Sequence, residues 1–541
     1  MKRAQSKNSQ YAQSDAKSIV ITGEDLTIEK LAAVSRKQVN IEFHKEVPGR
    51  VSASRDLLDS LLAQNEVIYG VNTGYGGNVR FLIPRSDLDA HQNNLLRFLC
   101  CGVGETLPSD VIRAAMLLRI NALSKGFSAI KMPTLALLRQ LLNSDIVPIV
   151  PRYGSVGASG DLIPSAYIAR VLLGEGTVMF RGAKIPASEA LRTANLAPIR
   201  LRAKEGLALV NGTSVMTAVA ALVLHDLDYL VRVCVATVAL AIDALRSTAD
   251  PFIEIIHKVK NHPGQMEVAR MLRRFTEGSG LSFSLEELRE AVRTYQQPST
   301  TALQVEESIQ SPYSLRCAPQ GLGPIFEGLE YAAAVLEREM NSVNDNPLVD
   351  GQSRGVYYTG NFYGGHIART MDIMKMDMAA LANWMHAIMA MLVDPRFSNG
   401  LPANLSSLPG LVTGFKGVQI SMTSVVCACR QMAGPSALHT LPTEQYNQDV
   451  VSLGLHSATA AMDMVPLVRN AAAMLLIALC QSIELRLREK EATRAGSLAI
   501  RLFEVVRKKV PFVDRDQPLD SDIAEVCSLI DQRAFGPLTG E

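Results

Sequence analysis

The segment HIARTMDIMKMDMAALANWMHAIMAMLVD, residues 366–394, decides the fold class of this chain. Its apolar residues recur in alternating steps of four and three, which is the spacing of a buried seam along a bundled helix. The seam consists of Ile367, Met371, Met374, Met378, Leu381, Met385, Ile388 and Leu392. A methionine stripe could also line a cofactor pocket, but packing in a core or an interface is far more common. The segment therefore predicts a long helix inside a bundle.

Two further segments, residues 216–247 and 458–489, show long apolar patterns of helical period. The three segments together predict a mainly α fold with a long central helical bundle that subunit association buries. Residues 19–151 instead mix short apolar runs with glycine and proline turns, which favours a smaller mixed N-terminal region. We expect a disordered tail at 1–18, an N-terminal domain at 19–215 and a long-helix bundle domain with C-terminal helices at 216–541.

The composition limits the classes of partner. The chain has 541 residues, is 48% apolar, and carries 54 basic and 53 acidic side chains, a net charge of +1. This balance offers no electrostatic footprint for nucleic acid or an anionic membrane, so we expect a small-molecule partner. The eight cysteines show no zinc-ligand spacing, and we expect free thiols and no metal in a reducing cytoplasm. The first 18 residues lack the apolar stretch of a secretory signal, and charges interrupt the longest apolar runs.

The glycine-rich loop GSVGASGDL, residues 154–162, allows four interpretations. Its glycines match neither GxGxxG nor a P-loop, so we expect no nucleotide there. Ser159 does not stand in the GxSxG motif of a nucleophilic serine. A plain turn is the default interpretation of an isolated Ala-Ser-Gly. The fourth interpretation is cyclisation of the backbone.

Cyclisation would use Ala158, Ser159 and Gly160 for different purposes. The amide nitrogen of Gly160 attacks the carbonyl carbon of Ala158, and loss of water closes a five-membered ring. Loss of a second water from Ser159 leaves an exocyclic methylene group. Gly160 permits the approach because it has no Cβ, and Ala158 is small at the crowded carbon. The product is a strong electrophile, which ordinary side chains do not provide.

The extended motif GSVGASGDLIP resembles the signature of the aromatic amino acid and histidine ammonia-lyase family, whose prosthetic group is 4-methylidene-imidazol-5-one (MIO). The resemblance covers residue 19 to the end, in family order, through IYGVNTGYGGN, HQNNLLRFL, KEGLALVNGTSVM, NHPGQ, YSLRCAPQ, NSVNDNPL, GNFYGGH and TEQYNQDVVSLG. One departure is Ser165, where the family usually has leucine, and it lies outside the ring-forming triad. The resemblance implies an MIO group formed autocatalytically from Ala158-Ser159-Gly160 in the N-terminal domain, with no metal and no nucleotide.

Removal of ammonia from an α-amino acid requires a base that takes a weakly acidic β-proton and a clamp for the carboxylate. Tyr69, in IYGVNTG, matches the family's catalytic base. A phenol has a reference pKa of about 10, so we expect the pKa of Tyr69 to be lowered for work near neutrality. Gly70, Gly74, Gly76 and Gly77 indicate a flexible lid that carries Tyr69 over the site.

The resemblance assigns the other site residues. Arg316 matches the carboxylate clamp, for which a guanidinium fork is well suited, and Asn346 a second carboxylate contact. Tyr313 and Asn211 match the residues beside the MIO group, where hydrogen bonds would stabilise developing negative charge. Taken alone, Asn211 would only cap the next helix. The remaining positions are Gln320, Glu444, Asn447 and Gln448 around the amine and the ring, with Glu444 a possible acceptor of the amine proton, and Tyr358 and Phe362 as weaker candidates for the pocket wall.

Phe98 and Leu99 occupy the place of the family's ring-selectivity pair. Histidine-specific members tend to have Ser-His there and tyrosine-specific members His-Leu, so Phe-Leu resembles the phenylalanine pattern. Two apolar side chains offer no partner to a phenolic hydroxyl or an imidazole, whose burial without one costs about 1–3 kcal/mol. We predict that the chain converts L-phenylalanine to trans-cinnamate and ammonia, with a tyrosine ammonia-lyase as an alternative.

The sequence also leaves room for an aminomutase and for an inert scaffold. Aminomutases of the family use the same group and return ammonia to the β-carbon, so a 2,3-aminomutase that makes a β-amino acid is the main enzymatic alternative. An inert helical scaffold is the non-enzymatic alternative, and the intact Ala-Ser-Gly, Tyr69 and Arg316 argue against it. The resemblance further implies a homotetramer in which each site is built from three chains, with Tyr69, the 313–320 segment and Glu444 from different subunits.

Overall fold

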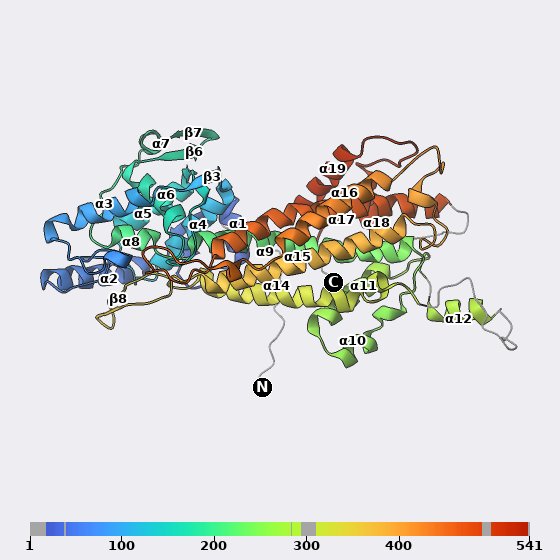
Figure 1. The fold of residues 1–541 in the computed structure, drawn as a ribbon, viewed down its shortest axis with the longest axis horizontal. Coiled ribbons are helices and arrows are strands. Elements are labelled where there is room, and N and C mark those ends of the chain that lie inside the picture. Colours follow the sequence, from blue (N-terminus) through green and yellow to red (C-terminus); the bar gives the residue numbers. More distant parts are fainter. Residues whose placement is uncertain (1–17, 37–38, 283, 294–309, 489–498, 539–541) are drawn as a thin grey trace. The chain divides into compact units, whose positions relative to one another are not determined.

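The computed structural model describes residues 18–36, 39–282, 284–293, 310–488 and 499–538. This part of the chain is mainly helical, with short strands between the helices (Figure 1), which confirms the predicted fold class. It forms two compact units. The first contains Met1–Ala218, Glu337–Tyr363 and Pro442–Asp449, and the second contains Val219–Leu336, Gly364–Leu441 and Val450–Glu541. Residues 1–17 of the predicted 1–18 tail lie outside the described residues, and Ser18 begins a short strand.

The domain boundary expected at residues 215–216 lies close to the first break between the units, at Ala218. The division is not linear, however, because two later segments of the chain join the first unit. These segments, Glu337–Tyr363 and Pro442–Asp449, carry Asn346 and Glu444 among the candidate site residues. A division by sequence position alone would have assigned both residues to the helical bundle.

The first unit joins small helices to short strands. Its helices are α1 (Ile28–Ser35), α2 (Val47–Ala63), α3 (Leu88–Leu99), α4 (Ser109–Leu123), α5 (Met132–Asn143), α6 (Leu162–Ala169), α7 (Ala187–Thr193) and α8 (Glu205–Val210). Its strands are β1 (Ser18–Ile21), β2 (Asn40–Phe43), β3 (Val103–Thr106), β4 (Val147–Pro148), β5 (Pro151–Tyr153), β6 (Thr177–Phe180), β7 (Ala183–Pro186), β8 (Leu348–Asp350) and β9 (Gly355–Tyr357).

The strands pair into four small sheets: parallel β1–β2, antiparallel β3–β5, antiparallel β4–β6–β7 and antiparallel β8–β9. A hydrophobic cluster that includes Leu58, Ile68, Val71 and Val349 packs the foot of the Tyr69 loop against α2 and β8. The site segments of this unit are therefore mounted on a packed core, although they lie far apart in the sequence.

Buried polar contacts fix the 344–346 segment within the first unit. Lys204 Nζ donates to Asp345 Oδ2 at 2.6 Å, and both side chains are almost fully buried. Burial lowers the pKa of Lys204, and the Asp345 carboxylate opposes this shift. Arg119 Nη1 donates to Asn344 Oδ1 at 3.1 Å. Buried charges need such partners because desolvation without one is expensive. Asn346 follows directly and is held by this anchor.

The second unit consists of helices. They are most of α9 (Ser214–Ala244), α10 (Glu254–Lys260), α11 (Pro263–Thr276), α12 (Leu285–Arg293), α13 (Tyr313–Arg316), most of α14 (Ala318–Met340), α15 (Gly365–Leu392), α16 (Lys416–Met432), α17 (Gly454–Arg488), α18 (Ala499–Arg507) and α19 (Asp520–Asp531). The long helices α15 and α17 pack along each other, and α16 packs against both.

The predicted seam of α15 is confirmed. All eight of its residues are fully buried, from Ile367 near the start of the helix to Leu392 at its end. Among the described residues, α17 is the one helix that is long and apolar enough to cross a membrane. Most of its apolar stretch is buried inside the second unit, where it packs on α15 and α16, so we interpret α17 as a core helix.

Shortening Met378 to alanine should destabilise the second unit by about 2–5 kcal/mol, because the buried side chain leaves a cavity in the seam. Met376 lies on the same helix but is 50% exposed, so Met376→Ala should change the free energy of unfolding by less than about 0.5 kcal/mol. Denaturant unfolding followed by circular dichroism measures both variants. Equal effects would contradict the assigned seam.

Candidate active site

The ring-forming loop lies against the segment that precedes α9. Ala158 and Gly160 are buried, and Ser159 is half-buried. Gly160 has a φ of +70° and forms a parallel β-bridge with Gly212. A Cβ on Gly160 would collide with the carbonyl oxygen of Gly212. Both the backbone conformation and the lack of space therefore require glycine at the position whose nitrogen would close the ring.

Asp161 holds this loop in place. Its amide nitrogen donates to the Gly212 carbonyl at 2.7 Å, and its buried carboxylate accepts from Ser155 Oγ at 2.8 Å and from the Met216 amide at 2.7 Å. Burial raises the pKa of Asp161 to about 6 against these stabilising hydrogen bonds. The sequence alone did not predict a role for Asp161, Ser155 or Gly212, whose only signal was their place beside the Ala-Ser-Gly and Asn-Gly motifs.

Two amide side chains contact Ser159. Asn211 Nδ2 donates to the Ser159 carbonyl at 3.1 Å, and Gln448 Nε2 donates to Ser159 Oγ at 3.1 Å. The buried Asn211 Oδ1 has no hydrogen-bond donor among the described residues. Only glycine fits at position 160, and the Asn211 amide donates to the Ser159 carbonyl that an MIO ring would keep, so these residues fit an MIO group at Ala158-Ser159-Gly160.

The Tyr69 loop turns at the short 3₁₀ segment Gly76–Asn78. The amide of Gly76 donates to the Tyr69 hydroxyl at 3.0 Å, and the next amide, that of Gly77, donates to Glu444 Oε1 at 3.1 Å. A Cβ on Gly76, which has a φ of +51°, would collide with the Glu444 carboxylate. Two successive backbone donors thus link the candidate base to the candidate amine acceptor.

The pKa of Tyr69 is raised above its ordinary value, not lowered as the sequence analysis expected. Burial of the phenol is the largest cause, because it disfavours the charged phenolate. The hydrogen bond from Gly76 lowers the pKa, whereas the negative charge of Glu444 raises it. The expectation failed because the sequence shows neither how deeply Tyr69 is buried nor that a carboxylate lies near it.

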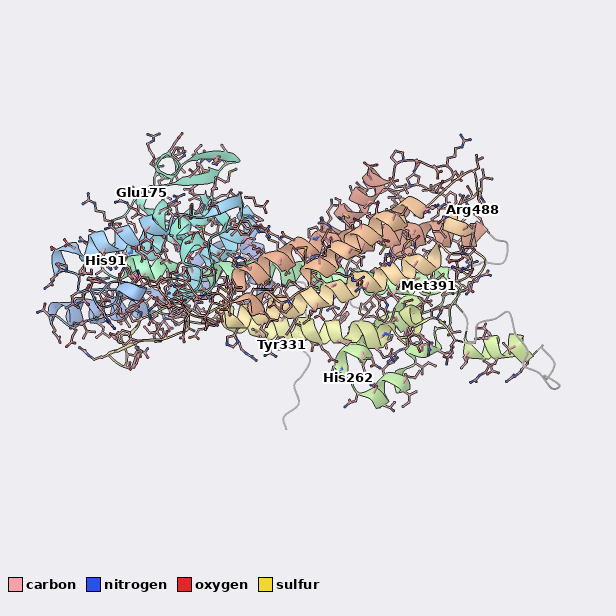
Figure 2. All side chains as sticks on the ribbon, viewed as in Figure 1. His91, Glu175, His262, Tyr331, Met391 and Arg488 are labelled. Atoms are coloured by element: carbon pink, nitrogen blue, oxygen red, sulfur yellow. The ribbon has the colours of Figure 1, made fainter. Side chains whose placement is uncertain are left out.

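The Tyr69 loop is anchored on α3. The Tyr75 ring stacks on His91 with a centroid distance of 4.2 Å, and Gln92 Nε2 donates to the Tyr75 hydroxyl at 2.9 Å. Figure 2 labels His91 on this helix. Gln92 Oε1 also accepts from the amide of Leu207 at 3.1 Å, so the buried Gln92 joins the loop to α8. Helix α8 ends next to Asn211, which places the loop and the Ser159 contacts on one connected support.

A cavity of about 650 Å³ lies beside this loop. It brings together three of the predicted residues, Tyr69, Asn346 and Tyr358. The rest of its lining is Val67, Thr73, Val79, Thr359 and Gly360. Asn346 Oδ1 accepts from the amide of Thr359 at 2.8 Å, which leaves the nitrogen of this side chain as the end that can donate to a carboxylate. Phe98, Leu99 and Phe362 are not among the lining residues.

Phe98 and Leu99 end helix α3 and point in different directions. Leu99 is buried, with 6% of its surface exposed, whereas Phe98 is 61% exposed. Neighbouring residues on a helix project about 100° apart, so one side chain enters the core when the other leaves it. Leu99 thus packs within the unit, and Phe98 offers a large apolar ring that the described part of the chain leaves exposed.

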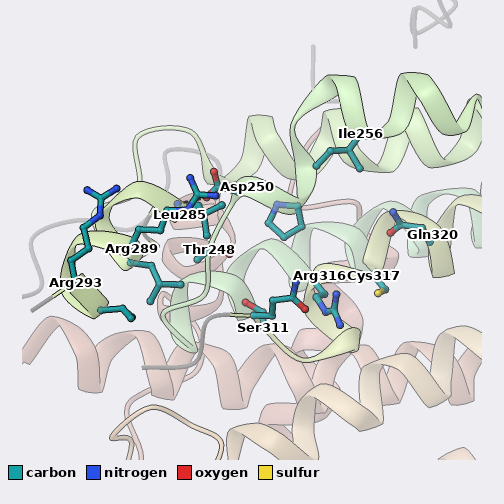
Figure 3. A pocket seen from close by; sticks show the side chains of 14 residues that line it. Thr248, Asp250, Ile256, Leu285, Arg289, Arg293, Ser311, Arg316, Cys317 and Gln320 are labelled. Atoms are coloured by element: carbon teal, nitrogen blue, oxygen red, sulfur yellow. Dashed lines mark hydrogen bonds between the residues drawn. The ribbon is translucent and has the colours of Figure 1, made fainter. Parts of the chain in front are cut away.

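The second unit carries Tyr313, Arg316 and Gln320. Arg316 and Gln320 line a cavity of about 700 Å³, shown in Figure 3 with Arg289 and Arg293 of α12. The Arg316 guanidinium lies over the Tyr313 ring, 4.5 Å from its centroid. Its buried Nε has no hydrogen-bond partner among the described residues. Arg316 therefore has donor capacity to spare, as a carboxylate clamp requires.

The turn from Thr443 to Gln448 places the last group of predicted residues. The backbones of Thr443 and Gln448 pair with each other, with N–O distances of 2.9 and 3.4 Å. Glu444 and Asn447 are exposed, and Gln448 is half-buried against Ser159. Because Glu444 contacts the Tyr69 loop within one chain, the prediction that these two residues come from different subunits is wrong for this pair.

The comparisons identify relatives over nearly the whole chain. A family model described as aromatic amino acid lyase matches residues 26–508. The histidine ammonia-lyase of Myxococcus xanthus is 38% identical, covering 95% of this chain and 96% of that enzyme. The tyrosine aminomutase structure from Streptomyces globisporus has a TM-score of 0.91 and 32% identity, covering 96% of this chain and 97% of its own. The Pantoea agglomerans phenylalanine aminomutase has a TM-score of 0.91 and 30% identity, covering 97% and 100%.

Replacing Gly160 with alanine should abolish ring formation, because the added methyl group collides with the Gly212 carbonyl. The purified Gly160→Ala variant should lack the near-ultraviolet absorbance that distinguishes the ring from ordinary residues. Gly49 of α2 has open space around it, so Gly49→Ala is a matched control that should keep the absorbance. A Gly160→Ala protein with undiminished absorbance would rule out this loop as the source of the group.

Proposed function

This chain belongs to the aromatic amino acid lyase family, and from that premise we propose that it removes ammonia from L-phenylalanine to give trans-cinnamate. The observation that carries the proposal is the Ala158-Ser159-Gly160 loop, held at Gly212 in a conformation that only glycine allows and contacted at Ser159 by Asn211 and Gln448. An inert scaffold would have no need for so constrained a backbone.

In the proposed enzyme, Asn211 would hold the MIO group through the carbonyl oxygen of Ser159, which the ring keeps. Gln448 contacts the Ser159 hydroxyl, which leaves as water during ring formation, and Asp161 fixes the backbone of the loop. The chemistry that the group supplies is that of an electrophile for the amino nitrogen, which makes this nitrogen a better leaving group. Asn211 can then stabilise negative charge with its amide donor, in a buried place where hydrogen bonds are strong.

Tyr69 is the proposed base, because this residue lines the same cavity as Asn346 and its hydroxyl is fixed by the Gly76 amide. A substrate carboxylate that accepts from the Asn346 amide would place its β-carbon inside this cavity, within reach of the phenol. Positioning of this kind supplies much of the rate in proton abstraction, because the reacting atoms need not be brought together anew.

The choice of phenylalanine depends on Phe98 and Leu99. Neither side chain can satisfy a phenolic hydroxyl or an imidazole, so tyrosine and histidine would each lose a hydrogen bond on binding. The Myxococcus relative is named for histidine, which makes a histidine ammonia-lyase a second candidate. Neither residue lines the cavity beside Tyr69 within one chain, so phenylalanine is preferred over histidine on the family position of the pair and on the apolar character of both side chains.

A 2,3-aminomutase is a third candidate, and the two solved structures named for aminomutase activity favour it. A lyase releases ammonia, whereas a mutase returns it to the β-carbon before the product leaves. Turnover of phenylalanine, tyrosine and histidine side by side, with the products identified by NMR, distinguishes all the candidates. Trans-cinnamate with free ammonia supports the proposal, whereas a β-amino acid or a preference for histidine would replace it.

We also propose a homotetramer with shared sites. Tyr313, Arg316 and Gln320 of one subunit would join the prosthetic loop of another, and the exposed rings of Phe98 and Tyr313 would be covered on assembly. Size-exclusion chromatography with light scattering measures the mass of the assembly, and an active monomer would refute the proposal. The eight cysteines are unpaired, which suits the reducing cytoplasm that we propose as its location.

Replacing Phe98 with histidine should shift the preference from phenylalanine toward tyrosine, because the imidazole can pair with the phenolic hydroxyl. The ratio of kcat/KM for tyrosine to that for phenylalanine should rise by about tenfold or more, as one recovered hydrogen bond implies. Phe397 is a comparably exposed phenylalanine in the second unit, and Phe397→His should leave the ratio unchanged. An unmoved ratio in Phe98→His would remove these residues from the pocket.

A further inference from the structure

The turn at Gly76 and Gly77 joins two ionisable groups that would otherwise act separately. Its two amides point to different acceptors, the Tyr69 hydroxyl at 3.0 Å and Glu444 Oε1 at 3.1 Å. The carboxylate lies against the Cα of Gly76, where an added Cβ would collide with it. The charge of Glu444 therefore lies next to the Gly76 amide that donates to the Tyr69 hydroxyl.

The Glu444 side of this contact is held in an uncommon conformation. Glu444, Gln445 and Tyr446 have φ values of +52°, +54° and +62°, a run of three side-chain-bearing residues in the left-handed region. This region is costly for such residues and persists where the surroundings impose it. The paired backbones of Thr443 and Gln448 close the turn, and Gln448 binds Ser159. The turn thus fixes the Glu444 carboxylate relative to both the Tyr69 loop and the ring-forming serine.

Few other ionisable groups influence Tyr69. Among the described residues, its pKa responds to Glu444, and the buried Tyr75 on the same loop responds in turn to Tyr69. His91 stacks on Tyr75, and burial lowers its pKa, so this imidazole is neutral near pH 7 and offers no positive charge to the phenol. The Gly76 amide is the hydrogen-bond donor that favours the phenolate.

We propose that Glu444 controls the base through the Gly76–Gly77 turn: its negative charge keeps Tyr69 protonated in the free enzyme, and a cationic amino group bound beside Glu444 cancels that charge and permits Tyr69 to ionise. The phenolic proton then passes to solvent, and the phenolate is left with the Gly76 amide as its donor. The inference rests on the proposed function and adds a specific role for Glu444. Glu444 contacts the substrate amine and acts on the base through its charge, so binding of an amine promotes the ionisation of Tyr69.

The coupling predicts the behaviour of the variant Glu444→Gln. The acid limb of the pH profile of kcat/KM for phenylalanine should move to lower pH, because the charge that opposes ionisation of Tyr69 is gone. Glu66 is an exposed carboxylate at the foot of the same loop, and it does not contribute to the shift of Tyr69. The control Glu66→Gln removes an equal charge and should leave the limb where it is in the unaltered enzyme.

A direct titration tests the same coupling without turnover. The tyrosinate absorbance of each protein is measured against pH, and that of its Tyr69→Phe counterpart is subtracted, so that only Tyr69 contributes. Ionisation should begin at lower pH in Glu444→Gln. Added 2-phenylethylguanidine, a cation whose charge survives at high pH, should lower the pKa of Tyr69 in the unaltered protein and lower it less in Glu444→Gln, which lacks the carboxylate that holds the cation.

The outcomes distinguish a failure of the Glu444–Tyr69 coupling from a failure of the proposed function. Unchanged titration of Tyr69 in Glu444→Gln, or an equal response to phenylethylguanidine in both proteins, would overturn the coupling even in an active enzyme. Failure to turn over any aromatic amino acid would overturn the proposed function, whereas the titration would still decide the coupling. A purely structural effect of Glu444→Gln would lower kcat without moving either the pH limb or the titration.

Discussion

The close approach of Gly160 and Gly212 is the constraint on which the site depends. At this point two backbone segments lie too near each other for a side chain, and the Asp161 amide ties them together at 2.7 Å. The contact bends the Ala158-Ser159-Gly160 loop and brings Ser159 to Asn211, which directly precedes Gly212. The Asn211–Gly212 segment therefore shapes the loop for ring closure and supplies an amide that can hold the ring once it has formed.

The residues that hold the site segments in place differ from the residues proposed to act on the substrate. The buried Lys204–Asp345 ion pair holds the segment that carries Asn346. The side chain of Gln92 holds the Tyr69 loop through its hydrogen bonds to Tyr75 and Leu207. None of these supporting side chains needs to touch a substrate. Buried polar networks of this kind fix a unique arrangement when every member is satisfied. The long helices of the second unit pack through their apolar seams, and this packing stabilises the unit that carries Arg316.

Sequence patterns predicted what is local and periodic. The α15 seam follows from spacing alone, because each of its residues faces the same side of one helix. The ring-forming triad was predicted from adjacent residues together with the resemblance of the rest of the chain to the family. The raised pKa of Tyr69 could not be predicted, since it depends on burial and on Glu444, and Gly77 and Glu444 are 367 positions apart. The structural role of Asp161 was missed for the same reason, because its contacts to Gly212 and Met216 are set by the fold.

The central claim is that this chain modifies its own backbone at Ala158-Ser159-Gly160. The intact mass of the purified, unaltered protein tests this most directly, because ring closure and the dehydration of Ser159 each remove one water molecule. The account predicts a chain lighter than its sequence by the mass of two water molecules, with the loss confined to a peptide that contains Ser159. A chain at its full sequence mass, with no enzymatic release of ammonia, would contradict it.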